Sequence, residues 1–294
     1  MEGMQTHSSV LISVIIPTYN RANSIIDTIQ SVVKQNIEAL EILICDDFST
    51  DNTEDVVNEY SKKYKNIKLL RRQDKGKGAN YARNNGIENA CGKYLVFLDS
   101  DDVLTEKSLS DRLKVFEDNP NIDLVYGDVE VGNFVHRFDK IQDFDQNSYI
   151  WEELSLCPFS VMMMKKDVFP TTPLLDVSLP SWQDDNMILN LHKCKKKFFH
   201  CGKVVASMRR VDSNISSNYW KRYNGLKKII SIYKGDVLKE KGLWRLFLWK
   251  LRLLSDYFLA KETDSTNLIY KTLYKISSKV LFSICAIFFR HIYG

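Results

Sequence analysis

The stretch Tyr94-Leu-Val-Phe-Leu98 is a short, wholly apolar run, and Asp99-Ser100-Asp101-Asp102 follows it directly. An apolar run of this length that ends at polar residues is typical of a strand buried on both faces of a parallel sheet. In open sheets of this kind, ligands bind beyond the carboxyl ends of the strands. The stretch therefore predicts a buried strand and, at its end, a group of carboxylates where a ligand would lie.

Similar apolar runs occur on both sides of this stretch, and helical patterns lie between them. Residues 21–36, for example, have Ile25, Ile29 and Val32 at helical spacing. Regular alternation of strands and helices is typical of an open, mostly parallel sheet with helices on both faces. The predicted strands are residues 13–17, 41–45, 67–70, 94–98 and 123–126, and the predicted helices are residues 21–36, 51–64, 78–90 and a fourth, capped by Thr105, that ends near Asn119.

The second half of the chain has a more mixed pattern, followed by a helical one. We expect an α/β domain over residues 1–215 and a basic, aromatic-rich helical region over residues 216–294. In the mixed part, the predicted strands are residues 160–164 and 204–208 and the predicted helix is 182–192. In the C-terminal part, the predicted helices are 219–233, 238–260 and 267–293.

The formal net charge of +4 hides a marked asymmetry along the chain. Residues 1–189 carry 19 Lys or Arg and 31 Asp or Glu, whereas residues 190–294 carry 22 and 6. An acidic first part suits a site that gathers carboxylates around a metal ion, and a basic second part suits an anionic membrane surface or a lipid diphosphate. Nucleic acid is not expected as a partner, because the chain has no recognised nucleic-acid-binding motif.

The six cysteines are expected to be reduced, since one of them lies within a predicted buried strand, and this favours a cytoplasmic location. Two groups of potential zinc ligands, His192 with Cys194 and His200 with Cys201, lack the order and spacing of a standard zinc site. The N-terminus lacks the layout of a secretory signal. The apolar run at residues 280–289 is too short to span a bilayer as a helix.

Two acidic segments follow predicted strands and are candidates for binding a ligand. Asp99 and Asp101 could share one hard divalent cation, which prefers oxygen ligands and completes its shell with phosphate oxygens. The alternative is a pair of solvated carboxylates before the next helix. Residues 46–53 are either a ligand-binding loop or a helix N-terminus rich in capping residues. A calcium loop is disfavoured there, because the glycine required at its sixth position is absent.

Four motifs stand in order along the chain: Ser13-Val-Ile-Ile-Pro-Thr-Tyr-Asn20, Asp46-Asp47-x-Ser-x-Asp-Asn-Thr53, Ala82-Arg-Asn-x-Gly86 and Phe97-Leu-Asp-Ser-Asp-Asp102. Together, in order and spacing, they resemble the successive motifs of glycosyltransferase family 2. The resemblance implies a Rossmann-like GT-A fold, a nucleotide-sugar donor that we expect to be UDP-linked, a divalent metal ion (Mn2+ or Mg2+) and inversion at the anomeric carbon. By the same resemblance, residues 11–128 would bind the nucleotide sugar and residues 129–215 would form the acceptor part.

The resemblance also implies roles for the matched residues on the donor side. Asp101 would hold the metal ion that bridges the diphosphate. Arg83 would lie near the donor, although an ion pair of its helix is an equally good interpretation. For the rest of the donor, the backbone around Pro17 and the ring of Tyr19 would flank the base, Asp47 would bond the uracil or the ribose, and Asp99 would bond the ribose or the sugar.

On the acceptor side the family has an acidic pair at the start of a helix, and Ser181-Trp-Gln-Asp-Asp185 matches it. The first acid is Asp184 where Glu is common. Asp185 would be the general base, and the alternative is that both acids merely favour the first turn of a helix. The family's Arg-x-His pattern corresponds to Arg210-Val-Asp212, in which Asp replaces His. A role in metal or diphosphate binding is therefore in doubt there, although Arg210 remains a candidate contact to the diphosphate.

The combined interpretation is an inverting glycosyltransferase that moves a sugar from a UDP-sugar to an acceptor hydroxyl. The acceptor would be a saccharide or a lipid-diphosphate-linked saccharide, in bacterial surface polysaccharide assembly of the O-antigen or capsule type. We expect a cytoplasmic protein, peripheral on the inner face of the cell membrane. The C-terminal helices would contact anionic lipid, the catalytic domain or a second subunit.

Two other functions fit part of the pattern. Residues 97–105 also resemble the nucleophile motif of haloacid-dehalogenase-type phosphatases, in which Asp99 would be phosphorylated. That motif closes the first strand of its fold, whereas three predicted strands precede it here. The second alternative is a non-catalytic, membrane-binding module on the same fold, and the presence of all the acids of the family's motifs argues against it.

Overall fold

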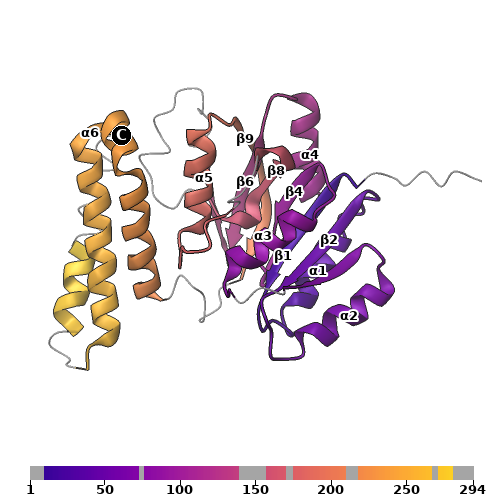
Figure 1. Ribbon diagram of the computed structural model, residues 1–294, viewed down its shortest axis with the longest axis horizontal. Helices are drawn as coiled ribbons and strands as arrows, with labels where there is room; N and C mark the ends of the chain where they lie inside the picture. Colours follow the sequence, from indigo (N-terminus) through magenta and orange to yellow (C-terminus); the bar gives the residue numbers. More distant parts are fainter. Residues whose placement is uncertain are drawn as a thin grey trace, which may run out of the picture. The chain divides into compact units, whose positions relative to one another are not determined.

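The structure is a computed structural model, and it describes residues 10–72, 76–138, 157–169, 175–209, 218–266 and 271–280. The chain forms two compact units (Figure 1). The first, here called the sheet unit, comprises Met1–Asp145, Leu156–Val177 and Asn190–Arg210. The second, here called the helical unit, comprises Gln146–Ser155, Ser178–Leu189 and Val211–Gly294.

The described strands of the sheet unit are β1 (Ile12–Thr18), β2 (Leu40–Asp46), β3 (Ile67–Arg71), β4 (Tyr94–Phe97), β5 (Asp102–Leu104), β6 (Leu124–Val131), β7 (Phe134–His136), β8 (Met162–Lys165) and β9 (Phe198–Met208). Their order in the sheet is β3-β2-β1-β4-β8-β6-β9-β5, with β7 paired to β6. The first four are mutually parallel, and β8 runs antiparallel to β4 and β6. The predicted α/β class, a central sheet flanked by helices, is confirmed (Figure 1).

Different helices cover the two faces of this sheet. The helices are α1 (Ile25–Val33), α2 (Thr53–Lys63), α3 (Ala79–Asn89) and α4 (Ser108–Asp118). Helices α1, α2 and α4 share one core cluster with Val14 and Ile16 of β1. Helix α3 lies against the next residue of that strand, so closely that a Cβ at Gly86 would come within 2.4 Å of the Ile15 side chain. Because successive strand residues point to opposite faces, a strand covered on both sides is apolar at consecutive positions, as Val14, Ile15 and Ile16 are.

Several predicted boundaries differ from the structure. β9 begins at Phe198, six residues before the predicted strand, because it pairs in parallel with the long strand β6. The predicted strand 160–164 begins as a 3-10 turn, η3 (Phe159–Val161), and only then becomes β8. A second 3-10 turn, η4 (Lys166–Val168), follows β8.

The predicted cap of α4 is wrong. The hydroxyl of Thr105 donates to the Val204 carbonyl oxygen at 2.7 Å, so this side chain ties the loop to β9. The helix begins only at Ser108, after Lys107, whose φ of 62° lies in the left-handed region.

Helix α6 (Tyr219–Asp264) dominates the helical unit and continues through the break that the sequence predicts between residues 233 and 238. That prediction is wrong, because Gly235 lies inside the helix, where glycine is unfavourable but tolerated. The break falls instead at Gly242, whose φ of 76° and ψ of −177° are not helical.

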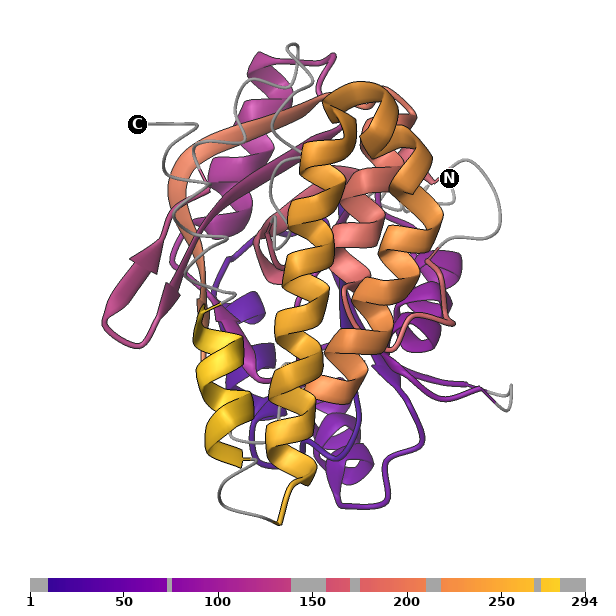
Figure 2. The same cartoon turned by 90° about the vertical axis from the view of Figure 1, so that its left-hand side faces the viewer.

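The two halves of α6 run antiparallel to each other (Figure 2). Arg222 Nη2 lies 2.7 Å from Asp256 Oδ1, and Trp220 Nε1 donates to Asp264 Oδ2 at 2.6 Å. Each pair joins a residue before Gly242 to a residue after it, so α6 is a helical hairpin.

A further helical segment, residues 271–280, packs on the second half of this hairpin. Ser255 Oγ donates to the Ser278 carbonyl oxygen at 3.2 Å, and the rings of Phe258 and Tyr274 are stacked. The other parts of the predicted helix 267–293, residues 267–270 and 281–293, lie outside the described residues. Within the described ranges, no helix is long and apolar enough to cross a membrane.

The parallel strands are tied together at their amino-terminal ends by one buried carboxylate, Glu41 of β2. Its Oε1 accepts from Ser13 Oγ of β1 and from Cys91 N before β4, both at 2.6 Å, and its Oε2 accepts from Lys68 Nζ of β3 at 3.0 Å. Burial raises the pKa of Glu41, but these three donors more than offset it, so the pKa lies below its ordinary value of 4.5.

We expect Glu41→Gln to lower the free energy of unfolding at pH 7 by about 2 kcal/mol, because hydrogen bonds to an ionised acceptor are lost. A folded-state pKa below the unfolded value stabilises the fold above pH 4.5, and this contribution is lost as the pH falls through the folded-state pKa. The difference in the free energy of unfolding between wild type and Glu41→Gln should therefore become smaller at acidic pH. Urea denaturation from pH 7 to pH 3 measures it. Glu88→Gln, an exposed change on α3, serves as the control, and a constant difference at all pH values would contradict the assignment.

Candidate active site

The carboxyl ends of β1, β2 and β4 lie side by side because the three strands pair in parallel. Thr18 is aligned with Asp46, and Ile15 is aligned with Phe97. The residues that follow these strands therefore reach one edge of the sheet. Pro17 is buried near the end of β1, whereas the side chain of Tyr19, just beyond it, is 48% exposed.

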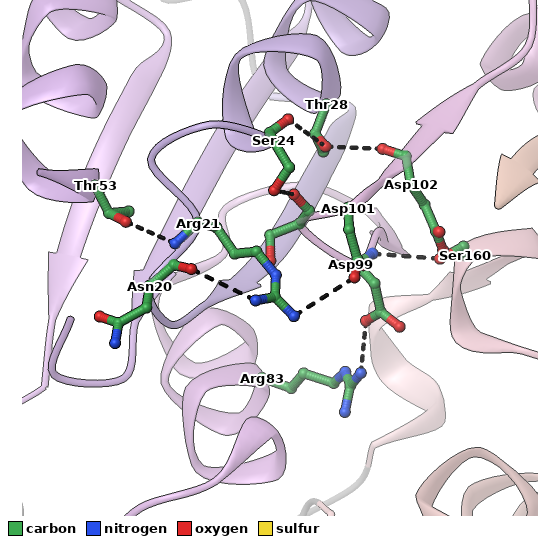
Figure 3. A network of polar contacts seen from close by, with 11 residues as sticks. Asn20, Arg21, Ser24, Thr28, Thr53, Arg83, Asp99, Asp101, Asp102 and Ser160 are labelled. Atoms are coloured by element: carbon green, nitrogen blue, oxygen red, sulfur yellow. Dashed lines mark hydrogen bonds and ion pairs between the residues drawn. The ribbon is translucent and has the colours of Figure 1, made fainter. Parts of the chain in front are cut away.

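The segment after β2 holds the loop after β1 in place. Asn20, whose φ is 51°, donates from its backbone N to Ser49 Oγ at 2.9 Å, and its Oδ1 accepts from Thr50 N at 2.7 Å. Next along the chain, Arg21 N donates to Thr53 Oγ1 at 2.8 Å (Figure 3). Several polar residues of the motif at 46–53 thus shape the backbone beside the exposed Tyr19 ring.

Asp47 is held from two sides. Arg72 Nη1 lies 2.5 Å from its Oδ1, and Gly78 N donates to its Oδ2 at 2.7 Å. The guanidinium of Arg72 also stacks over the Tyr81 ring at 4.6 Å. Burial raises the pKa of Asp47, and the Gly78 hydrogen bond and the charge of Arg72 only partly offset this. Contact between Asp47 and the uracil or ribose stays a prediction.

The neighbouring Asp46 is a further candidate at this edge. Its Oδ2 accepts from Ser49 N at 3.0 Å, whereas its Oδ1 is buried with no hydrogen-bond partner among the described residues. Buried acceptors are nearly always paired, so this oxygen is suited to a ligand donor.

Asp99, after β4, is gripped by Arg83 of α3 (Figure 3). Arg83 Nη2 lies 2.7 Å from Asp99 Oδ1, and its Nη1 donates to Asn80 Oδ1 at 3.2 Å. The Arg83 guanidinium lies over the Phe159 ring at 4.2 Å. Its ion pair therefore reaches across to a strand end and does not lie within its own helix.

Asp101 and Asp102 differ in environment although they are adjacent. Asp101 Oδ2 lies 3.5 Å from Arg21 Nη2 (Figure 3). Burial raises the pKa of Asp101, the charge of Asp99 raises it further, and Arg21 offsets part of this. Asp102 Oδ2 accepts from Ser160 Oγ at 2.6 Å, and burial with the charge of Asp99 raises the pKa of Asp102 to about 8. Asp102 is thus an internal structural group, and Asp101 forms the candidate site with Asp99.

This pair of carboxylates fits a divalent cation that takes its other ligands from a substrate. Mg2+ is usually bound by one or two carboxylates together with phosphate oxygens and water. In the part of the chain that the structure describes, no group of three or more His, Cys, Asp or Glu residues could hold a metal ion alone. Asp101, with Asp99 beside it, would supply the protein's oxygens.

The predicted acceptor acids belong to the helical unit, where α5 (Gln183–Lys193) begins. Trp182, which precedes α5, has a φ of 60°, and its Nε1 donates to the Arg222 carbonyl oxygen at 2.9 Å. A Cβ at Gly225 would come within 2.3 Å of Ser181 Oγ, so α6 packs tightly against this turn. Asp185 is buried. Its role as general base stays a prediction, and the Arg210–Asp212 pattern lies outside the described residues.

The sequence profile of the family described as Glycosyl transferase family 2 matches residues 13–171. The chain belongs to glycosyltransferase family 2. It is 34% identical over 217 residues to UDP-Glc:alpha-D-GlcNAc-diphosphoundecaprenol beta-1,3-glucosyltransferase WfgD of Escherichia coli, covering 72% of this chain and 81% of that protein. It is 27% identical over 281 residues to GalNAc(5)-diNAcBac-PP-undecaprenol beta-1,3-glucosyltransferase of Campylobacter jejuni, covering 92% and 88%.

Solved structures show the same fold for this glycosyltransferase. Staphylococcus aureus TarS 1–349 in complex with UDP-GlcNAc has a TM-score of 0.66 at 20% identity, over 91% of this chain and 79% of that one. A mannosyltransferase of Pyrobaculum calidifontis in complex with GDP-Man and Mn2+ has a TM-score of 0.60 at 17% identity, over 92% and 86%. The predicted GT-A fold is confirmed. Family membership also favours the transferase over the phosphatase considered from residues 97–105.

Three site residues of the family 2 glycosyltransferase were missed from the sequence. Arg72 follows β3, so the rule that ligands lie beyond strand ends could have found it. Arg21 lies next to a quoted motif. Ser160 had no signal, because its contact with Asp102 joins segments 58 residues apart.

Proposed function

We propose that this glycosyltransferase moves a sugar, with inversion, from a UDP-sugar to a hydroxyl of a saccharide carried on a lipid diphosphate. The observation that carries the proposal is the Asp99–Asp101 pair at the end of β4, beside the ends of β1 and β2. The relatives from E. coli and C. jejuni are named for acceptors on diphosphoundecaprenol or PP-undecaprenol, which supports a role in bacterial surface glycan assembly.

On the donor side, the exposed ring of Tyr19 and the backbone around Pro17 would flank the base. Asp47, with the buried Oδ1 of Asp46 beside it, would accept hydrogen bonds from the uracil or the ribose. Arg83 holds one oxygen of Asp99 at 2.7 Å, which leaves the other to bind ribose or sugar. A site built to accept from uracil N3–H would reject cytosine, which lacks that proton.

The transfer is proposed as a single displacement. Asp185 would remove the proton of the acceptor hydroxyl as its oxygen attacks the anomeric carbon, and the bond from that carbon to the UDP oxygen would break on the opposite face. A divalent ion held by Asp101 would stabilise the charge that develops on the leaving diphosphate. The sheet unit would thus bind and activate the donor, and Asp185 would activate the acceptor.

Such an enzyme would work in the cytoplasm, peripheral on the inner face of the cell membrane, where lipid-linked acceptors are exposed to cytoplasmic nucleotide sugars. Mn2+ or Mg2+ would serve as the ion, because both accept carboxylate and phosphate oxygens. Oligomerisation through the C-terminal helices stays a prediction.

A donor screen tests the proposed function. Nucleotide release from UDP-, GDP-, CDP- and dTDP-sugars is measured with and without a short lipid-diphosphate-linked saccharide acceptor. We expect acceptor-dependent release from a UDP-sugar and weaker binding of CDP than of UDP. Equal affinity for UDP and CDP would contradict the contact to uracil, and release from another donor alone would contradict the choice of UDP.

We expect Asp101→Asn to lower turnover by about 100-fold or more, because charge stabilisation at the leaving group is a large part of catalysis. Chelation with EDTA should do the same to the wild type, and added Mn2+ or Mg2+ should restore it. Asp118→Asn makes the same change at an exposed position on α4, and its turnover should equal that of the wild type. Full wild-type activity in EDTA would refute the metal-dependent mechanism.

We expect Asp185→Asn to abolish sugar transfer and to leave UDP affinity within a few-fold, since the base does not touch the nucleotide. Asp184→Asn is the matched control, because adjacent helical residues point about 100° apart and cannot both face the acceptor. It should change mainly the KM for the acceptor. Steady-state kinetics and calorimetry with UDP separate these effects. If Asp184→Asn is inactive while Asp185→Asn transfers sugar, then Asp184 is the base and Asp185 serves acceptor binding.

A further inference from the structure

The hairpin of α6 has a turn whose geometry is set by one residue. Gly242 adopts a φ of 76° and a ψ of −177°, a region that essentially only glycine occupies. A Cβ there would meet no atom within 4 Å, so backbone conformation and not crowding requires the glycine. The chain therefore fixes which side chains stand at the tip of the hairpin.

Those side chains are apolar and exposed. Leu243 is 78% exposed, the highest value among the exposed large apolar side chains of the described residues. Trp244 and Phe247 are each 46% exposed, and their rings stack with centroids 5.3 Å apart. Leu238, on the other side of the turn, is 38% exposed. Together they form an apolar surface, here called the hairpin tip, on one short turn of the fold.

Basic side chains accompany the hairpin tip. Lys234, Lys239 and Lys250 are exposed, whereas Glu240 is the one exposed acid between residues 234 and 250. Apolar and aromatic side chains among lysines are the composition that binds the interface of an anionic bilayer, through apolar burial and attraction to the charged headgroups. Tryptophan is enriched at such interfaces, where its ring contacts the acyl boundary and its N–H stays near water.

We propose that the hairpin tip docks on an anionic membrane surface, with Leu243, Trp244 and Phe247 entering the boundary between headgroups and acyl chains. The positive charge of the lysines favours an anionic lipid surface over a second copy of this chain, because the hairpin tip of a second copy carries the same lysines and would repel it. The inference rests on the proposed peripheral location and specifies which surface makes the contact. It assigns this contact to the turn at Gly242.

Vesicle flotation tests the assignment with the full chain. Wild type is mixed with vesicles of phosphatidylglycerol and phosphatidylethanolamine, or of phosphatidylcholine alone. We expect flotation with the anionic vesicles only, and about a tenfold loss of binding when Leu243, Trp244 and Phe247 are all changed to Ser. Lys239→Gln with Lys250→Gln should weaken binding to the anionic vesicles and leave the fold intact.

Two matched controls locate the effect. Phe134→Ser removes a side chain that is 66% exposed in the sheet unit, and Ile276→Ser removes one that is 53% exposed in residues 271–280. Both should float like wild type. The blue shift of tryptophan emission on adding anionic vesicles should vanish in Trp244→Phe and persist in Trp220→Phe. Circular dichroism checks that every variant is folded.

Three results would overturn the assignment: a triple Ser variant that floats like wild type, a loss of flotation in Ile276→Ser instead, or a wild-type dimer that only the triple variant dissociates. Transfer from a UDP-sugar to a short, water-soluble acceptor keeps this test separate from the proposed function. Activity of the triple variant there, with lost flotation, supports the hairpin tip. Absence of transfer in the wild type would count against the proposed function alone.

Discussion

The parallel pairing of β1 with β2 on one side and with β4 on the other is the constraint on which the site depends. All three strands leave the sheet at the same edge: Thr18 of β1 is level with Asp46 of β2, and Phe97, the last residue of β4, is level with Ile15. Tyr19, Asp47 and Asp99 come shortly after these strand ends. At the other end, the buried carboxylate of Glu41 joins β1, β2 and β3. A slip by one residue would turn every strand side chain to the opposite face. The core and the edge that carries the candidate site are therefore set by the same hydrogen bonds between strands.

The same arrangement of strand ends brings the carboxylates of Asp99 and Asp101 together at a partly buried edge of the sheet. Burial and the neighbouring charge of Asp99 raise the pKa of Asp101, although Arg21 lies 3.5 Å from it. Carboxylates whose ionised forms are disfavoured in this way bind a cation more readily than isolated ones do, because a cation removes their mutual repulsion. Arg83 offsets only part of this negative charge, since it pairs with one oxygen of Asp99. The pKa of Asp101 is thus raised although two arginines, Arg21 and Arg83, lie at this edge, so the proposed divalent ion would meet negative charge that they leave unbalanced.

Much of the fold could be predicted because buried strands and amphipathic helices have different apolar periods. The acids at strand ends followed from the same argument. What could not be predicted depends on tertiary contacts: Arg72 reaches Asp47 from the next strand, and Thr105 bonds β9 in place of capping a helix. The hairpin turn was misplaced because a glycine within a helix and a glycine that breaks one look alike in sequence. Only the backbone angles of Gly242 distinguish it from Gly235.

The helical unit contains both the predicted acidic pair and the hairpin tip, which lie far apart in the sequence. The turn before α5, with Ser181 and Trp182, is bonded to the first half of α6, and Asn186 of α5 accepts from Tyr233 Oη at 3.0 Å. The acidic pair is thus positioned by the same helical hairpin that exposes Leu243 at its tip. A lipid-linked acceptor must place its sugar hydroxyl at a fixed height above the bilayer. A hairpin that both contacts the lipid, as proposed, and positions the predicted base would set that height without a separate anchor.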